Sequence, residues 1–406
     1  MATIGRVSVE NFLSFSKFAI ELGPLNVLVG PNGTGKTNFL KIFQFLGEVA
    51  RNDLSPTIED FGGLDAIKFR GPAAHKTIKI HLQGLITPHA SLGAPDEYTL
   101  NVWELRFRRH GEPDERRRAI ARREEIVLKR TRGRGRRITL SGGKIEVTAI
   151  RPTSRTAKSP ERLAVRPESS GLSTIRRLGD EYGATQVDDL AQVFEGLRLF
   201  EVDVEKARLP GLMENAERLA PNAANLASHL LWLREKHEHI FAQICEDVQF
   251  VLPSFEDFLF VPVGGAQSAV RVDIKEARLH GATPLGMASF GTIRAIALFA
   301  MLHDPDPPRL TCLEEVDHGL HPHALDRLVE RLREASERTQ IIAATHSPAL
   351  VNRLEPEDLR IFERDQDTGA SRLAEISLSD IISMQHESGY QLGELWFSGS
   401  LGGVLE

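Results

Sequence analysis

The stretch Gly30-Pro-Asn-Gly33-Thr-Gly35-Lys36-Thr37 matches the pattern G-x-x-x-x-G-K-[ST] of a phosphate-binding loop. An apolar run over residues 25–30 precedes it and predicts a buried strand. Residues 38–46 follow with apolar side chains at i, i+3, i+4 and i+7, which predicts an amphipathic helix. Strand, loop and helix are the context that this motif requires, and they indicate an α/β fold with a nucleotide site.

Each residue type in this loop has a chemical role. The glycines allow backbone N–H groups to curve around a phosphate at the positive end of the helix. The Lys36 side chain can reach the β- and γ-phosphate oxygens, and the Thr37 hydroxyl can bind Mg²⁺. ATP and Mg²⁺ are therefore the expected ligands, and the expected nucleotide-binding residues are Gly30, Asn32, Gly33, Thr34, Gly35, Lys36, Thr37 and Asn38.

Two further apolar strands end in polar residues. Residues 310–313 are followed by the adjacent carboxylates Glu314 and Glu315. In a nucleotide site the first can hold Mg²⁺ and the second can accept a proton from the attacking water. Residues 340–345 lead to His346, which can contact a γ-phosphate or orient water. We expect Lys36, Glu315 and His346 to act in catalysis, and Thr37 and Glu314 to hold the metal.

The composition describes a soluble globular protein. The chain has 406 residues, 41% of them hydrophobic, and a formal net charge of −6. The longest uncharged run, residues 80–95, contains two prolines and is too short to cross a bilayer as an apolar helix. The N-terminus lacks a signal-peptide pattern, and two cysteines cannot form a disulfide framework. These features predict a cytoplasmic protein without a membrane contact.

The charge is unevenly distributed. Residues 106–137 contain 14 basic and 5 acidic residues, a local charge of +9 within a chain that is otherwise acidic. This segment is either a loop that grips nucleic-acid phosphates or a solvated hairpin partly neutralised by its own carboxylates. The candidate nucleic-acid contacts are Arg116, Arg117, Arg118, Arg122, Arg123, Arg132, Arg134, Arg136 and Arg137.

The pattern of hydrophobic residues divides the chain into four parts. Residues 1–97 carry the phosphate loop, and residues 98–180 contain short, antiparallel strands and a linker rich in Pro, Ser, Arg and Gly over 151–180. Helical spacing dominates residues 181–255. Residues 256–406 return to strands alternating with helices, and heptads are not sustained long enough for a coiled-coil arm.

Together these motifs resemble the ABC-type ATPase heads of the RecF/SMC/OLD superfamily, and most closely the compact AAA-type ATPases often found in bacterial defence loci. The resemblance rests on order and spacing along nearly the whole chain. The matching segments are residues 11–15, 30–37, 289–294, 313–322, 344–348 and the ending 389–403.

The resemblance implies a two-lobed P-loop ATPase head with an antiparallel β-rich arm and a helical insertion. Ser289, Gly291 and Thr292 would form the ABC signature, which in this superfamily binds the γ-phosphate of ATP held by the opposite protomer. It therefore implies an ATP-dependent homodimer. Phe290 and Val316 depart from the usual motifs, and Gln83 is one candidate for the glutamine loop, although a surface glutamine fits equally well.

Chain length narrows the biological role. Only 60 residues follow His346, which leaves no room for a C-terminal nuclease, so we expect a separately encoded effector such as a nuclease. The leading hypothesis is an ATPase that couples nucleic-acid or phage sensing to this effector in antiphage defence. The alternatives are a RecF-like DNA repair ATPase and an ATP-bound scaffold that cages an effector.

Overall fold

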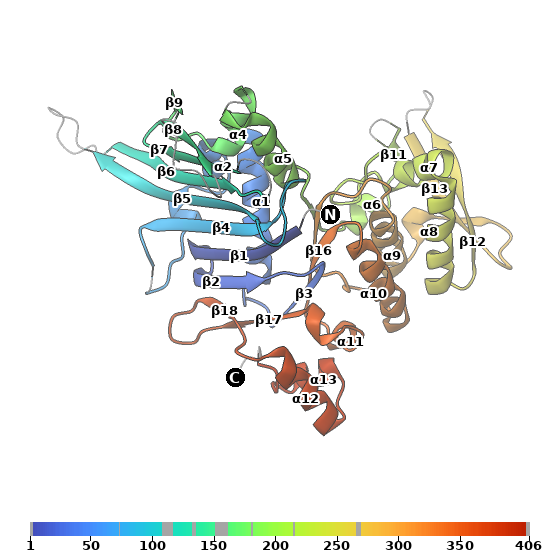
Figure 1. Ribbon diagram of the computed structural model, residues 1–406. Helices are drawn as coiled ribbons and strands as arrows, with labels where there is room; N and C mark the ends of the chain where they lie inside the picture. The colour runs from blue at the N-terminus through green and yellow to red at the C-terminus, as the bar shows by residue number, and fades with distance from the viewer. Residues whose placement is uncertain are drawn as a thin grey trace.

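A computed structural model describes residues 3–72, 74–107, 117–131, 135–150, 161–179, 182–213, 216–264 and 269–402. It has two lobes joined by a central sheet (Figure 1). One lobe is built around a large antiparallel sheet, and the other is mainly helical. The fold is the two-lobed, mixed α/β fold expected, and no helix within the described residues exceeds the 17 residues of α1 (Lys36–Asn52), so the prediction of no long coiled coil is confirmed.

The central sheet has six strands in the order β10-β15-β16-β3-β17-β18. The first five are parallel, and β18 pairs antiparallel with β17. Strands β3, β15 and β16 are buried along their whole length, as expected for parallel strands covered on both faces. The strands are β3 (Leu25–Val29), β10 (Arg198–Phe200), β15 (Leu310–Leu313), β16 (Gln340–Thr345), β17 (Leu359–Arg364) and β18 (Ser371–Leu373).

The second sheet has eight antiparallel strands in the order β2-β1-β4-β5-β6-β7-β8-β9. Helices α1, α4 and α5 contribute to its hydrophobic core, and burial alternates along β4 because one face is covered. Its strands are β1 (Thr3–Phe12), β2 (Phe15–Glu21), β4 (Thr77–Leu85), β5 (Asp96–Phe107), β6 (Arg117–Leu128), β7 (Gly135–Ser141), β8 (Lys144–Ile150) and β9 (Glu161–Ala164). The helices of this lobe are α2 (Leu54–Asp60), α3 (Leu64–Ile67), α4 (Gly171–Thr174) and α5 (Ala184–Glu195), with a 3₁₀ turn at Ile175–Arg177.

Two features of this sheet differ from the sequence prediction. The predicted domain boundary between residues 97 and 98 falls inside strand β5, which is hydrogen bonded to β4 along this stretch. The linker predicted over 151–180 is wrong for residues 161–178, because β9 joins the sheet and Leu172 and Ile175 are fully buried beneath it. Residues 151–160 lie outside the described part of the chain.

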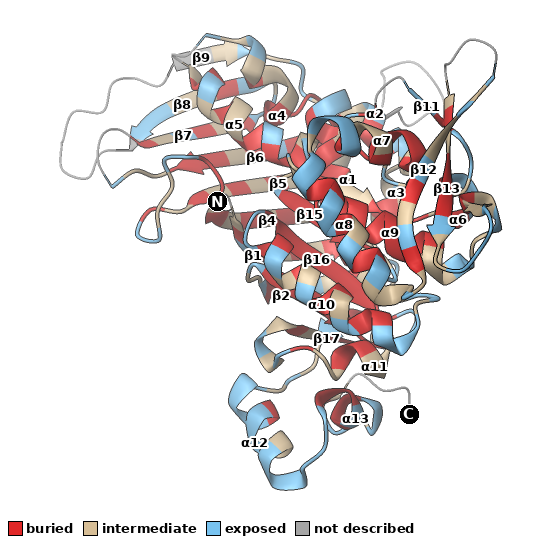
Figure 2. Cartoon of the chain, turned by 90° about the vertical axis from the view of Figure 1, so that its right-hand side faces the viewer, coloured by how far each residue is buried: buried red, intermediate tan, exposed pale blue. Residues whose placement is uncertain are grey.

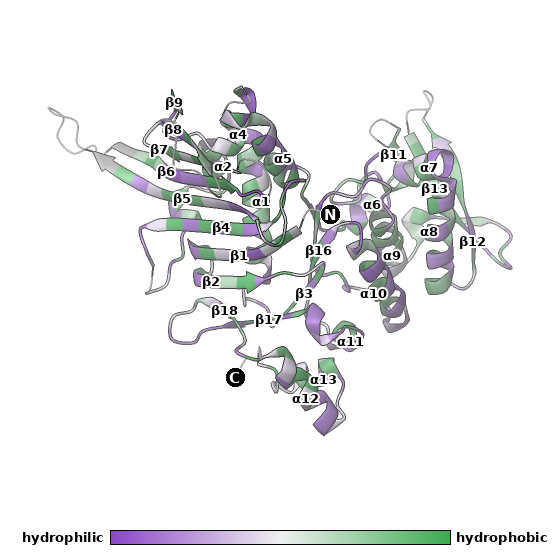
Figure 3. Ribbon diagram, in the orientation of Figure 1, coloured by the Kyte–Doolittle hydropathy of each residue, from purple (hydrophilic) through white to green (hydrophobic). Residues whose placement is uncertain are grey.

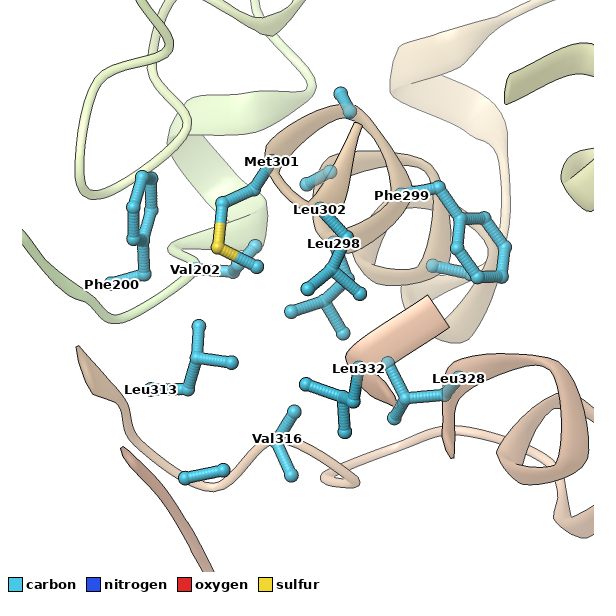
Figure 4. Close-up of a cluster of buried hydrophobic side chains, with 14 of the residues drawn as sticks. Phe200, Val202, Leu298, Phe299, Met301, Leu302, Leu313, Val316, Leu328 and Leu332 are labelled. Atoms are coloured by element: carbon cyan, nitrogen blue, oxygen red, sulfur yellow. The ribbon is translucent and has the colours of Figure 1, made fainter. Parts of the chain in front are cut away.

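The helical lobe forms the second hydrophobic core. Helix α9 is buried over residues 293–302 and packs against α8 and α10, while Leu313 and Val316 connect this core to the central sheet (Figure 4). The lobe contains α6 (Val204–Ala207), α7 (Leu226–Lys236), α8 (Glu238–Val251), α9 (Phe290–Leu302) and α10 (Pro322–Ser336). A small sheet of β11 (Gly211–Leu212), β12 (Phe255–Val263), β13 (Ala269–Glu276) and β14 (Ala282–Pro284) lies at its outer side, followed by a 3₁₀ turn at Leu285–Met287.

The last elements extend from the edge of the central sheet (Figure 2). Helix α13 packs against α11, whereas α12 is exposed along most of its length. These elements are α11 (Pro348–Val351), a 3₁₀ turn at Pro356–Asp358, α12 (Leu378–Ser388) and α13 (Leu392–Phe397). Within the described residues, no helix combines the length and apolar character needed to cross a bilayer.

Candidate functional site

The phosphate loop lies between β3 and α1, where the sequence predicted it. Gly30 has φ 153° and Gly35 has φ 103°, values that favour glycine. A Cβ at Gly30 would overlap the carbonyl oxygen of Phe362, and one at Gly35 would overlap the side chain of Ser371. These two glycines therefore let the loop turn tightly against the neighbouring chain.

Lys36 folds back over the loop. Its Nζ donates hydrogen bonds to the carbonyl oxygens of Gly30, at 2.5 Å, and Pro31, at 2.9 Å. Burial lowers the pKa of Lys36 to about 8, and the nearby Glu315 carboxylate partly opposes this shift. The negative charge of a bound polyphosphate would stabilise the protonated form of this desolvated lysine.

A cavity of about 400 Å³ opens in front of the loop. It brings together residues from four strand ends of the central sheet and from the start of α9. Of the predicted nucleotide-binding residues in the loop, Gly30 and Thr34 do not line it and instead shape the loop. The cavity is lined by Asn32, Gly33, Gly35, Lys36, Thr37, Asn38, Glu201, Val202, Phe290, Arg294, Glu314, Glu315, His318, Ala344, Thr345 and His346.

Glu314 lies directly behind Thr37. The Thr37 hydroxyl hydrogen bonds to the Glu314 carboxylate, while burial raises the pKa of Glu314. Its Oε1 is buried and has no hydrogen-bond partner among the described residues. A hydroxyl and a carboxylate oxygen with unused acceptor capacity match the oxygen ligands that Mg²⁺ prefers, so these residues fit a magnesium ion.

Glu315 is more exposed than its neighbour Glu314. Its backbone has φ 46°, an uncommon value for a residue with a side chain. The Glu315 side chain is 58% exposed, lines the cavity, and its Oε2 lies 3.2 Å from Nδ1 of His318. A water molecule in the cavity can therefore reach the Glu315 carboxylate, whereas the Glu314 carboxylate is hydrogen bonded to the Thr37 hydroxyl.

Arg294 holds the backbone of Glu315 in place. Its guanidinium donates to the carbonyl oxygens of Val202, at 3.1 Å, and Glu315, at 2.6 Å. The side chain comes from α9 and is buried, which lowers its pKa. This one residue therefore connects α9 to the strand ends of β10 and β15, and it supports the position of Glu315.

His346 follows the end of β16 and is exposed to the cavity. The preceding residue fixes the loop, because the Thr345 hydroxyl donates to Oδ1 of Asp317 at 2.5 Å and accepts from the backbone N–H of Ser347 at 3.0 Å. The loop that follows β15 and the loop that follows β16 are thus hydrogen bonded to each other.

The predicted signature residues occupy the start of α9. The Ser289 side chain caps the helix by accepting from the N–H of Thr292 at 3.1 Å. A Cβ at Gly291 would lie 2.5 Å from the carbonyl oxygen of Gly319, so the helix start and the loop after Glu315 approach backbone to backbone. Ser289, Gly291 and Thr292 do not line the cavity of their own chain, whereas Phe290 does.

Comparison with known proteins agrees with this arrangement. A family profile described as "AAA domain, putative AbiEii toxin, Type IV TA system" matches residues 25–352. The chain belongs to this AAA-domain family. No curated protein matches the sequence.

Solved structures show the fold of this AAA-domain protein. An Smc head bound to the C-terminal winged-helix domain of ScpA superposes with a TM-score of 0.55 at 14% identity, covering 94% of this chain and 99% of that one. The Smc head of Pyrococcus furiosus, with an extended coiled coil and bound to the C-terminal domain of ScpA, gives 0.50 at 13% identity, covering 96% and 100%. The fold is that of an SMC-type ATPase head.

Several cavity residues of the AAA-domain protein were missed by the sequence analysis, and Glu201 is the acidic one among them. Glu201 follows the three-residue strand β10, which lies parallel to β15 at the same sheet edge. The signal in the sequence was weak, because Glu201 follows only two apolar residues, Leu199 and Phe200. Gln83, the earlier candidate for the glutamine loop, lies in β4 of the antiparallel sheet, opposite Arg6 and Glu97, and does not line the cavity.

Most described residues of the arginine-rich region lie in strands β6 and β7. The expected phosphate contact is wrong for Arg122, whose side chain is 0% exposed and lies 3.8 Å from the buried Glu124 carboxylate. Arg123 is exposed, Arg136 is half-buried, and Arg137 pairs with Glu125 at 3.0 Å. The predicted residues Arg116, Arg132 and Arg134, and the side chains of Arg117 and Arg118, lie outside the described part of the structure.

Proposed function

We propose that this protein binds and hydrolyses ATP, and that ATP-dependent homodimerisation couples nucleic-acid or phage sensing to a separate effector. The observation that carries the proposal is the cavity in which Lys36, Thr37, Glu314, Glu315 and His346 converge from separate strand ends. These side chains supply a phosphate-binding cation, two oxygen ligands for a metal, a base and a polar group near the γ-phosphate position.

Each residue has a distinct role in this mechanism. Lys36 exchanges its two carbonyl partners for the β- and γ-phosphate oxygens. Thr37 and Glu314 would hold Mg²⁺, which neutralises charge on the phosphates when bound. Glu315 accepts a proton from the attacking water, and His346 contacts the γ-phosphate or orients that water.

The signature residues support a homodimer. Ser289 is exposed at the N-terminus of α9, yet it lies outside the cavity of its own chain. A helix N-terminus favours a phosphate, so this position suits the γ-phosphate of ATP held by a second protomer. Closure of two heads on two ATP molecules would then be the signal that an effector detects.

The comparisons support the biological side of the proposal. The family description names a toxin of a type IV toxin–antitoxin system, which favours a defence role over DNA repair. The Smc heads with the same fold were solved with a domain of ScpA bound, so heads of this type can carry a second protein. Both points agree with a separate effector.

The variant Glu315→Gln tests the proposal. It removes the base but keeps the shape of the side chain, so we expect ATP binding to persist, turnover to fall about 10²- to 10⁴-fold, and the protein to remain a dimer with ATP. Light scattering and steady-state phosphate release measure these effects, with the exposed Glu337→Gln as the matched control. An ATP-bound protein that stays monomeric would refute dimer closure.

The same assay separates an enzyme from an ATP-bound scaffold. Lys36→Ala removes the phosphate-binding cation and should abolish ATP binding, while Lys17→Ala on the exposed face of β2 should not. A wild-type turnover no higher than that of Lys36→Ala would favour the scaffold.

A further inference from the structure

Helix α12 has little contact with the rest of the protein. Of its 11 residues, only Ile381 is buried. Its ends are nevertheless well formed, with a capping box between Ser377 and Asp380 and Gly389 in the left-handed conformation at the C-terminus. A helix of this length is marginal in water without tertiary packing, and the described residues supply α12 with little apolar contact.

Exposed apolar side chains lie on α12 and on the residues that come after it. Leu378 is 44% exposed and Ile382, one turn later, is 39% exposed. Tyr390, just after the helix, is 59% exposed, and Phe397 at the end of the neighbouring helix α13 is 76% exposed. We call these four residues the C-terminal apolar surface; Figure 3 shows hydrophobic and hydrophilic residues interspersed along α12 and α13. Leu378 and Ile382 share one face of α12, and exposed apolar side chains grouped on a face in this way indicate an interaction site.

The surroundings of this surface are acidic. Residues 373–402 contain four carboxylates and no lysine or arginine. All four are exposed, and Asp380 and Glu394 are used in helix caps. The other two, Glu375 and Glu387, have no ion-pair partner among the described residues. The surface therefore offers apolar contacts together with unneutralised negative charge.

The surface is connected to the nucleotide cavity. Helix α11 begins at Pro348, two residues after His346, and α13 packs against it. The Gly393 N–H donates to Oδ1 of Asn352 at 2.7 Å, and a Cβ at Gly393 would overlap the carbonyl oxygen of Pro348. Movement of the loop that carries His346 would therefore reach α13 directly.

We infer that the C-terminal apolar surface docks a partner protein through an amphipathic segment whose apolar side chains are flanked by lysine or arginine. Charge complementarity decides this chemistry, because residues 373–402 carry four exposed carboxylates and no lysine or arginine, and His386 is the one basic side chain of α12. A second copy of this chain is disfavoured, since a symmetric contact through the same surface would bring like carboxylates together. The inference rests on the proposed function in one respect: the docked partner is taken to be the separate effector.

A defined peptide pair provides the probe. One 18-residue peptide carries leucines on one helical face and lysines beside them, and its matched control carries glutamates in place of the lysines. Fluorescence anisotropy with the full-length protein should show binding of the lysine peptide at least tenfold tighter than binding of the glutamate peptide. Equal affinities, or no binding of the lysine peptide, would overturn the inference.

Variants localise the binding. The double variant Ile382→Ser with Phe397→Ser should bind the lysine peptide at least tenfold more weakly than the wild type does. A separate double variant, Glu375→Lys with Glu387→Lys, should also lose at least tenfold in affinity. The matched control changes two apolar residues exposed elsewhere, Leu92→Ser with Leu279→Ser, and should leave affinity unchanged.

Hydrogen exchange supplies a second readout. The amides of α12 should exchange more slowly when the lysine peptide is bound, because the peptide completes the packing of this helix. Protection elsewhere but not in α12, or a dimer that is lost in the Ile382→Ser and Phe397→Ser variant, would contradict the assignment.

The outcome is separable from the proposed ATPase function. Lys36→Ala should lose ATP binding but still bind the lysine peptide. The variants of the C-terminal apolar surface should bind ATP but no longer bind the peptide. Loss of both activities in either variant would overturn the separate docking surface.

Discussion

The two large sheets of this protein place charged residues in different positions. In the parallel sheet, the polar residues Lys36, Glu314, Glu315 and His346 lie at or beyond strand ends and reach one cavity. In the antiparallel sheet, charged residues lie within the strands, where alternate side chains point inward. A charged residue in the sequence therefore indicates a functional site only where the fold leaves its side chain accessible. Within a strand, the same residue type can be buried in the core.

The Arg122 region shows the second case. Glu124 accepts hydrogen bonds from the Tyr98 hydroxyl, at 2.8 Å, and from the backbone N–H of Gly171, at 2.6 Å. The Arg122 Nε donates to the carbonyl oxygen of Ser169 at 2.5 Å. This buried group fastens residues 169–171 to the sheet, which is a structural role for Arg122, one of the candidate nucleic-acid contacts.

The largest test of this comparison is Arg122→Ala. Removing one member of a buried ion pair leaves Glu124 uncompensated and should lower the free energy of unfolding by about 3–5 kcal/mol. Arg123→Ala, one residue later on the exposed face, should change it by less than about 0.5 kcal/mol. Urea unfolding measures both, and equal stability of the two variants would contradict the structural role of Arg122.

The next test concerns Glu201 and Gln83, which also lie in different sheets. Glu201 faces the cavity, where a carboxylate can orient water around the metal and phosphates, so Glu201→Ala should lower kcat about tenfold. Gln83→Ala should change kcat less than about twofold. A larger loss for Gln83 would reassign the glutamine loop to the antiparallel sheet.

A smaller effect is expected from the pKa of Lys36, which is about 8 in the free protein. Bound polyphosphate favours the ammonium form and raises this pKa, so above pH 8 binding requires uptake of a proton. ADP affinity should therefore fall about tenfold between pH 7 and pH 9. AMP, which lacks the β-phosphate, should show a weaker dependence in calorimetric titrations; equal slopes would show that Lys36 does not contact that phosphate.

The smallest effect is expected at the exposed arginines. If the antiparallel sheet binds duplex DNA, Arg123→Ala should reduce the slope of log K against log salt by about 1. Arg278→Ala, an exposed arginine of the helical lobe, should leave the slope unchanged. A wild-type slope near zero would remove this sheet from nucleic-acid binding, whereas about six phosphate contacts would give a slope near −5.

Much of the candidate site could be predicted because its signals are local. The phosphate loop and the strand ends at Glu314 and His346 are each visible in a short window of sequence. Glu201 follows a strand of only three residues, too short for a clear pattern. The burial of Arg122 depends on which face of β6 is covered, and the structured part of the expected linker depends on two buried side chains, Leu172 and Ile175. Both are properties of the assembled fold.

The position of β3 has a consequence for synthesis of the protein. Strands β1 to β9 include a long antiparallel sheet made from the first 164 residues, so that lobe can begin to fold early. β3, however, lies between β16 and β17, and Leu25 pairs with Ile341. A ribosome must therefore release about nine-tenths of the chain before the phosphate loop has both neighbouring strands, and the nascent protein should be unable to capture ATP until then.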